Sequence, residues 1–138
     1  MNDSGLRDLP ELLRQLEPLR RDGEFVVVST TSETTLPALA TVAEDEGTTL
    51  VLERHEADAF RLGYTATFAW LTLTVHSSLE AVGLTAAVAG ALAERGISCN
   101  VLAGFHHDHL LVPYERAEEA LATLRELSAS VADPVAQG

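Results

Sequence analysis

The chain has 138 residues, 46% of them hydrophobic, which suffices for one compact domain or two small fused modules. Its formal net charge is −12, with 21 acidic against 9 basic residues, and this argues against a nucleic-acid partner. The only cysteine, Cys99, excludes an intrachain disulfide and fits a reducing cytoplasm. Neither a secretory signal nor an apolar run of membrane-spanning length is present. We therefore expect a cytoplasmic protein with no membrane partner.

The N-terminal part predicts a helix and then a strand. Leucines recur at helical spacing from Leu6 to Leu16, and Pro18 limits the end of that helix. Residues 24–30, EFVVVST, have the β-branched composition of a strand with a buried face. Residues 31–37 are polar and predict a loop.

A hairpin and a short helix follow in the first half. Residues 38–43 and 48–52 predict two strands, and Gly47 supplies the positive φ that the turn between them needs. A short helix is expected over residues 56–62, with Gly63 at its end.

The second half begins with a strand and a helix. Residues 71–75, LTLTV, alternate as in a strand with one buried face. Ser77 and Glu80 have the spacing of a capping box, which predicts that the next helix starts there. That helix carries one apolar stripe, and we expect Gly90 within it to allow close approach to the sheet. Gly96 is placed to end it. The stripe consists of Leu84, Val88 and Leu92.

A hairpin and a last helix complete the pattern. Residues 97–103 and 109–112 predict two strands around the turn 104–108, and Pro113 closes the second strand. Small and apolar residues recur at helical spacing from Ala117 to Leu127.

This element order predicts an α+β fold, a two-layer ferredoxin-like sandwich with antiparallel sheets. The second half lacks the last strand of a βαββαβ unit, and the first half begins with a helix as though its first strand were missing. We therefore expect tandem modules that share strands, over residues 1–65 and 66–132, with a frayed tail at 133–138. Exposed edges or helix faces favour a homodimer.

Residues 83–121, GLTAAVAGALAERGISCNVLAGFHHDHLLVPYERAEEAL, resemble the ACT domain, the regulatory module that binds amino acids. The similarity is to the variety found in aspartate kinases, and the whole chain is similar to small stand-alone bacterial proteins with two ACT-like modules. The resemblance implies that a ligand lies between modules. It would be held by the loop after the first strand, the start of the next helix and the following strand. Carried over to this sequence, these positions are Val75, His76, Ser77, Ser78, Glu80, Val82, Gly83 and Leu84, with Cys99, Asn100 and Val101 opposite.

The loop has suitable chemistry apart from the resemblance. A helix N-terminus presents unpaired N–H groups to a carboxylate, and Glu80 could pair with an ammonium group. Gly83 would permit close approach. The alternative is that Ser77 and Glu80 only cap the helix.

The turn FHHDH, residues 105–109, concentrates side chains that can bind a ligand or a metal ion. Phe105, His107 and His109 are candidate contacts for a ligand side chain, where the aspartate kinase pattern instead has a Tyr and a Thr or Ser. On a continuous strand the two histidines would share a face, which could bind zinc, but no helical His motif supplies further ligands. We predict neither a metal nor a cofactor. Cys99 is expected to be a small buried apolar residue.

Three functions follow in order of preference. The first is a non-enzymatic regulatory protein that binds an amino acid or similar metabolite and acts in trans on an unknown protein target. The second is a ligand-free ACT-like module for dimerisation or interaction. The third is a metal-dependent enzyme that uses the histidine cluster.

Overall fold

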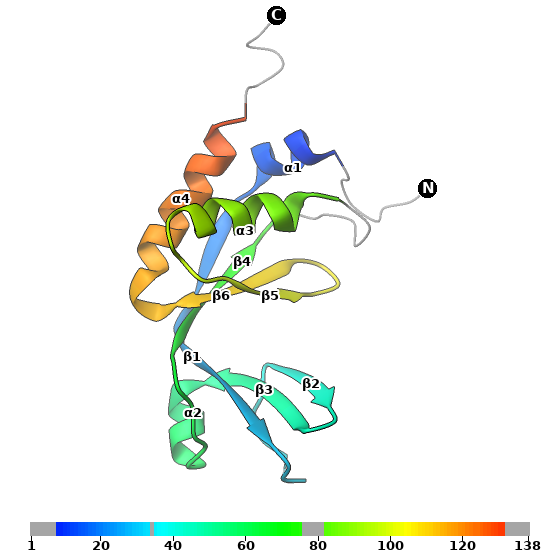
Figure 1. Ribbon diagram of the computed structural model, residues 1–138, viewed down its shortest axis with the longest axis vertical. Helices are drawn as coiled ribbons and strands as arrows, with labels where there is room; N and C mark the ends of the chain where they lie inside the picture. The colour runs from blue at the N-terminus through cyan, green and yellow to red at the C-terminus, as the bar shows by residue number, and fades with distance from the viewer. Residues whose placement is uncertain (1–7, 34, 76–81, 132–138) are drawn as a thin grey trace, which may run out of the picture.

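The protein is an α+β sandwich with one antiparallel six-stranded sheet in the order β2-β3-β1-β4-β6-β5 (Figure 1). The structure, a computed structural model, describes residues 8–33, 35–75 and 82–131. The tail at 133–138 lies outside these residues. The elements in chain order are α1 (Leu9–Gln15), β1 (Pro18–Thr30), β2 (Ala40–Glu44), β3 (Gly47–Glu53), α2 (Arg54–Ala59), β4 (Phe68–Leu73), α3 (Leu84–Glu94), β5 (Asn100–Ala103), β6 (Asp108–Pro113), the 3-10 turn η1 (Tyr114–Arg116) and α4 (Ala117–Ala129).

Strand β1 is shared by the two halves of the molecule. Its first part, residues 18–21, pairs with β4, and its second part, residues 25–30, pairs with β3. The register shifts between these parts, where Gly23 has a φ of +117°. Figure 1 shows β1 running through both halves. The expectation of shared strands is confirmed, although in one continuous sheet. The division between residues 65 and 66 stays a prediction.

Strand β1 begins earlier than predicted. The predicted strand covered residues 24–30, whereas β1 also includes the preceding PLRRDG, which carries three charged residues and a glycine. Backbone pairing with β4 holds this part in the sheet, and Leu19 remains 54% exposed. Its strand conformation therefore depends on tertiary pairing more than on local composition.

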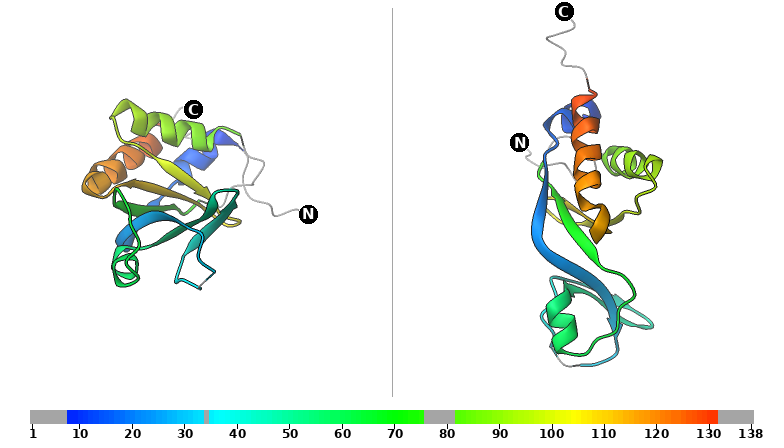
Figure 2. Two further views of the ribbon diagram at one scale, coloured as in Figure 1. Left: turned by 60° about the horizontal axis from the view of Figure 1, so that its bottom comes forward. Right: turned by 90° about the vertical axis from the view of Figure 1, so that its left-hand side faces the viewer.

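Helices α1, α3 and α4 cover one face of the upper part of the sheet (Figure 2). Leu12 of α1, Leu92 of α3 and Leu124 of α4 are fully buried there, against Leu71 of β4 and Val112 of β6. At about 25 cal/mol per Å² of apolar area, this burial is the main source of stability. The helix of the N-terminal half thus completes the core of the C-terminal half.

Helix α2 covers the lower part of the sheet. Its Ala57 packs against Val26 and Val28 of β1 and Leu52 of β3. Since neighbouring residues of a strand point to opposite faces, Phe25 points the other way. It packs there with Trp70, at a ring-centroid distance of 5.5 Å.

Helix α3 begins later than the capping-box spacing predicted. Its first residue is Leu84, and its N-cap is Gly83, which has a left-handed φ of +103°. Ser77 and Glu80 lie outside the described residues. The predicted stripe on α3 is buried as expected, and Gly96, with a φ of +70°, follows its end. The prediction for Gly90 was wrong, because this residue is exposed and a Cβ there would meet no atom within 4 Å.

Helix α2 also differs from its prediction. It spans Arg54–Ala59 in place of residues 56–62, and the left-handed position after it is Arg61, with a φ of +58°. Gly63 therefore does not end the helix. The backbone N–H of Leu62 donates instead to the carbonyl of Ala57, which closes the last turn at 2.8 Å.

Candidate functional site

Of the predicted ligand loop, the structure describes the two ends, Val75 after β4 and Val82–Leu84 at the start of α3. Val75 and Leu84 are buried in the core beneath the helices, at 5% and 3% exposure. Their side chains therefore contribute packing, and only their backbone groups remain for a ligand. Four of the predicted residues lie outside the described part of the chain, namely His76, Ser77, Ser78 and Glu80.

Val82 and Gly83 form the described entrance to α3. Val82 is 82% exposed, an unusual position for a β-branched apolar side chain. Within the part of the chain that the structure describes, no side chain caps the first N–H groups of α3. A Cβ on Gly83 would lie 3.0 Å from Cδ2 of Leu9 in α1, so glycine also allows close packing at this point.

The predicted residues on and before β5 do not share one face. Cys99 and Val101 pack against the core beneath the helices, whereas Asn100 pairs with Leu111 and points to the opposite face. Burial raises the pKa of the Cys99 thiol, which keeps it protonated and disfavours a nucleophilic role. The structure therefore brings Val75, Leu84, Cys99 and Val101 together in the core and separates Asn100 from them.

The tip of the β5–β6 hairpin carries the predicted aromatic contacts. Phe105 is 75% exposed and meets His106 edge to face, at a centroid distance of 5.1 Å. The N–H of Gly104 donates to the carbonyl of His107 at 3.0 Å, which closes the turn. Nδ1 of His107 is buried and has no hydrogen-bond partner among the described residues.

His109 is held by a hydrogen-bond network on β4. Its Nδ1 accepts from Nε1–H of Trp70 at 3.2 Å and lies 3.0 Å from Oγ1 of Thr72. Because the indole N–H can only donate, Nδ1 carries no proton and Nε2 does. Burial is the main cause that lowers the pKa of His109, with smaller contributions from His107 and Arg21. The ring is therefore neutral near pH 7.

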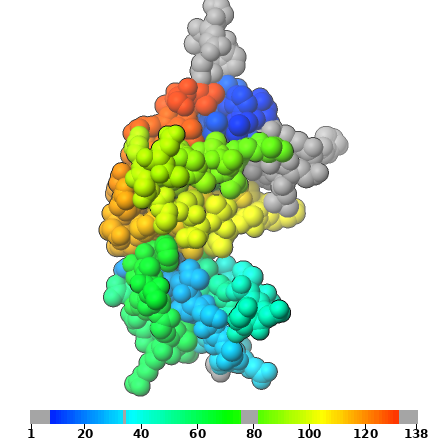
Figure 3. Space-filling model, in the orientation of Figure 1, coloured from blue at the N-terminus to red at the C-terminus, as the bar shows by residue number. Residues whose placement is uncertain are grey.

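A cavity of about 220 Å³ lies over Trp70 and His109, on the face of the sheet opposite the helices. We call it the Trp70 cleft. Figure 3 shows the β5–β6 hairpin and the β2–β3 hairpin projecting on the same side, with a notch between them. The strands at the two ends of the sheet order, β2 and β5, both contribute to its walls. Its lining consists of Leu39, Ala40, Trp70, Leu102, Ala103, Gly104 and His109.

Sequence reasoning found only His109 among these lining residues. The Trp70 side chain is itself buried, at 5% exposure. Leu39 and Leu102 belong to opposite edges of the sheet, so no local pattern relates them. The one usable signal was the single Trp in a strand with a His in the neighbouring strand.

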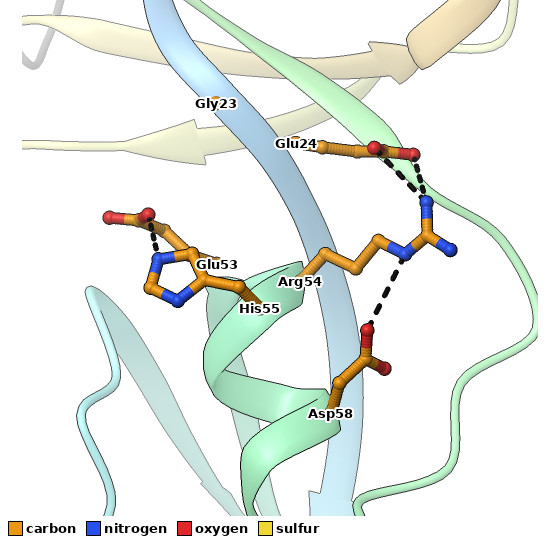
Figure 4. A pocket seen from close by; sticks show the side chains of 6 residues that line it. All are labelled: Gly23, Glu24, Glu53, Arg54, His55 and Asp58. Atoms are coloured by element: carbon orange, nitrogen blue, oxygen red, sulfur yellow. Dashed lines mark hydrogen bonds and ion pairs between the residues drawn. The ribbon is translucent and has the colours of Figure 1, made fainter.

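A second, polar pocket of about 250 Å³ lies beside α2 (Figure 4). The Arg54 guanidinium lies 3.2 Å from the Glu24 carboxylate and 3.7 Å from the Asp58 carboxylate. Tyr64 accepts a hydrogen bond from Arg54 and donates one to Asp58. Arg54 is the one arginine among the described residues that line this pocket. Because it is already paired with carboxylates, it fixes α2 to β1 and is not free to bind a ligand.

In the part of the chain that the structure describes, we looked for a metal site and for a membrane-spanning helix. Over residues 8–33, 35–75 and 82–131, no group of three or more His, Cys, Asp or Glu residues is arranged to hold a metal ion. Within the same residues, no helix is long and apolar enough to cross a membrane.

Comparisons with known proteins agree with this architecture. A solved Vibrio cholerae protein of unknown function, described as a possible transport protein, is 45% identical with a TM-score of 0.80, over 87% of this chain and 95% of its own. An Agrobacterium tumefaciens protein is 16% identical with a TM-score of 0.67, over 82% and 89%. The ligand-free regulatory subunit of Thermus thermophilus aspartate kinase is 8% identical with a TM-score of 0.55, over 80% and 95%. The last two share the fold.

A comparison with curated proteins finds no match. Two ACT-domain family models match in tandem, one over residues 4–69 and the other over residues 66–126. The shared strand, the two-layer architecture and these matches lead to one conclusion: the chain is a small member of the ACT-domain family, with one match in each half.

Proposed function

We propose that this protein binds an amino acid, or a similar small metabolite, and regulates another protein in trans. The observation that carries the proposal is the tandem ACT match, which accounts for residues 4–126. The fold likeness to regulatory regions of aspartate kinases agrees with a regulatory role. We infer no catalytic role, and we place the protein in the cytoplasm, where Cys99 stays reduced.

The proposed binding region is the N-terminal end of α3. Val82 and Gly83 present backbone groups there, and the uncapped N–H groups of α3 suit a carboxylate. The other proposed neighbours are His76, Ser77, Ser78, Glu80, Cys99 and Val101, whereas the side chain of Asn100 points to the opposite face of the sheet. Because a helix end alone is a common feature, the family membership and not this geometry is the main support.

Regulation would proceed by population shift. A ligand that binds one arrangement of the two halves, or of a homodimer, more tightly than another would stabilise that arrangement by its differential affinity. Strand β1 pairs with both β3 and β4. A movement of β1 in one half of the molecule would therefore also move the strand with which the other half pairs.

Thermal denaturation with each of the standard amino acids at millimolar concentration tests the proposal. A specific ligand at about 100 times its Kd should stabilise the protein by about 2.7 kcal/mol. Ser77→Ala, in the proposed binding loop, should reduce that response while the melting temperature without ligand is kept. Ser29→Ala, at an exposed position of β1, is the control and should respond as the unaltered protein does.

The alternative is a ligand-free module that only assembles. At the ends of the sheet, β2 and β5 each pair with one other strand among the described residues, and Val42 on β2 is 50% exposed. Such an edge can pair with another chain. A stable dimer, together with no thermal response to any amino acid, would favour this alternative over the proposed function.

A further inference from the structure

We infer that the Trp70 cleft is a second binding site, separate from the region at α3, and that it takes a small carboxylic acid with an apolar body. This inference does not depend on amino-acid binding at α3. The cleft lies on the opposite face of the sheet from the core that contains Val75 and Leu84.

The residues that line the cleft determine the size and polarity of the group that it can bind. Leu39 and Ala40 line one side and Leu102 and Ala103 the other, with Trp70 between them. The volume of about 220 Å³ equals the liquid volume of about seven water molecules. This is below the range of about 300–1,000 Å³ typical of sites for drug-sized ligands. The walls therefore suit a branched aliphatic or single-ring aromatic group.

His109 supplies a directed hydrogen-bond donor. Its Nδ1 is occupied by Trp70 and Thr72, so the proton lies on Nε2. Among the described residues, Nε2 has no hydrogen-bond partner, and it lies beside Gly104 in the cleft lining. A Cβ at position 104 would lie 3.1 Å from Nε2 and 2.7 Å from the carbonyl oxygen of His107, so glycine keeps this corner open.

Arg21 supplies the positive charge that selects an acid over a neutral molecule. Its guanidinium lies 5.2 Å from the Trp70 ring centroid, and it is near enough to His109 to contribute to lowering its pKa. Arg14, Arg20, Arg54, Arg95 and Arg116 form ion pairs with carboxylates. Within the described residues, Arg21 has no such ion pair. In a chain of net charge −12, an unpaired guanidinium beside an apolar cleft is a specific attraction for a carboxylate.

The same lining disfavours the ammonium group of a free amino acid. None of the described residues that line the cleft is acidic, so a buried ammonium group would lack a carboxylate partner among them. The expected ligand is therefore an acid without an α-amino group, which distinguishes this site from the one proposed at α3.

Fluorescence of Trp70, the only tryptophan of the chain, gives a direct test. Phenylacetate and 3-methylbutanoate are titrated into the full-length protein, each beside its neutral amide. We expect saturable changes with the acids and weaker binding of the amides. Arg21→Gln should weaken acid binding by about tenfold or more, as expected for loss of a charged hydrogen-bonding partner. Arg125→Gln removes an exposed arginine of α4 and should change nothing.

His109→Phe retains a ring but removes the Nε2 donor, and should weaken acid binding by about tenfold as well. Thermal melts of each variant establish that it is folded. The inference is overturned if neither acid gives a saturable change up to about 10 mM. It is also overturned if acids and amides bind alike, or if Arg21→Gln and Arg125→Gln bind the acids equally. Amino-acid binding at α3 could persist in each of these cases.

Discussion

At the scale of single residues, the burial of His109 makes the stability of the fold depend on pH. Its Nδ1 accepts a hydrogen bond from Trp70, and burial lowers its pKa below the ordinary value of about 6.5. His107 and Arg21 lower it further, whereas the Asp108 carboxylate opposes them. Since the unfolded chain binds this proton more readily, the contribution of His109 to stability is present above about pH 6.5 and is lost as the pH falls through its folded pKa.

The prediction is that the free energy of unfolding decreases from about pH 7.5 to pH 5.5, and that His109→Gln makes this decrease smaller. Urea denaturation at a series of pH values measures it. His55→Gln is the control, because His55 is 70% exposed beside Glu53. An unchanged pH dependence in His109→Gln would show that the neutral imidazole does not contribute to the fold.

At the scale of elements, two glycines illustrate opposite uses of this residue. Gly23 has a φ of +117° at the register shift of β1, and a Cβ there would lie 3.2 Å from Cζ of Phe25. Gly90 lies on the exposed side of α3, where a Cβ would meet no atom within 4 Å. The first conformation needs glycine, and the second does not.

We therefore expect Gly23→Ala to destabilise the protein by about 1–3 kcal/mol, the usual cost of a strained backbone. Gly90→Ala should stabilise it by about 0.5–1 kcal/mol through helix propensity. Chemical denaturation of the two variants beside the unaltered protein measures both. If both substitutions changed the free energy of unfolding by the same amount and in the same direction, the register shift of β1 would not depend on Gly23.

The helices and strands also differ in how well the sequence predicted them. The stripe on α3, with Leu84, Val88 and Leu92, was correct because local periodicity determines it. The predicted start of α3 differs from the observed one, because Gly83, with a left-handed φ of +103°, is the N-cap and Leu84 the first residue of the helix. The first part of β1 was missed because pairing with β4, a tertiary property, makes it a strand.

At the scale of the whole molecule, β1 makes the two halves one folding unit. It pairs with β3 over residues 25–30 and with β4 over residues 18–21, while α1 packs on α3 and α4. The expectation of incomplete modules that share strands was therefore correct. The Trp70 cleft could not be predicted, because it forms where opposite edges of the sheet approach each other.

The prediction is a single cooperative unfolding transition, with the same midpoint by Trp70 fluorescence and by far-UV circular dichroism. A fragment of residues 66–138 should not fold alone, since it lacks β1 and α1. Two separate transitions, or a folded fragment, would show that the halves are independent domains.

The proposed function depends on the binding of an amino acid at the N-terminal end of α3. The most direct measurement is a two-dimensional ¹H–¹⁵N NMR titration of the full chain with the standard amino acids. We predict that at least one gives saturable shifts concentrated at Val82, Gly83 and the amides around Asn100. The account would be contradicted if no amino acid shifts any amide, or if the shifts lie only in distant elements such as α2.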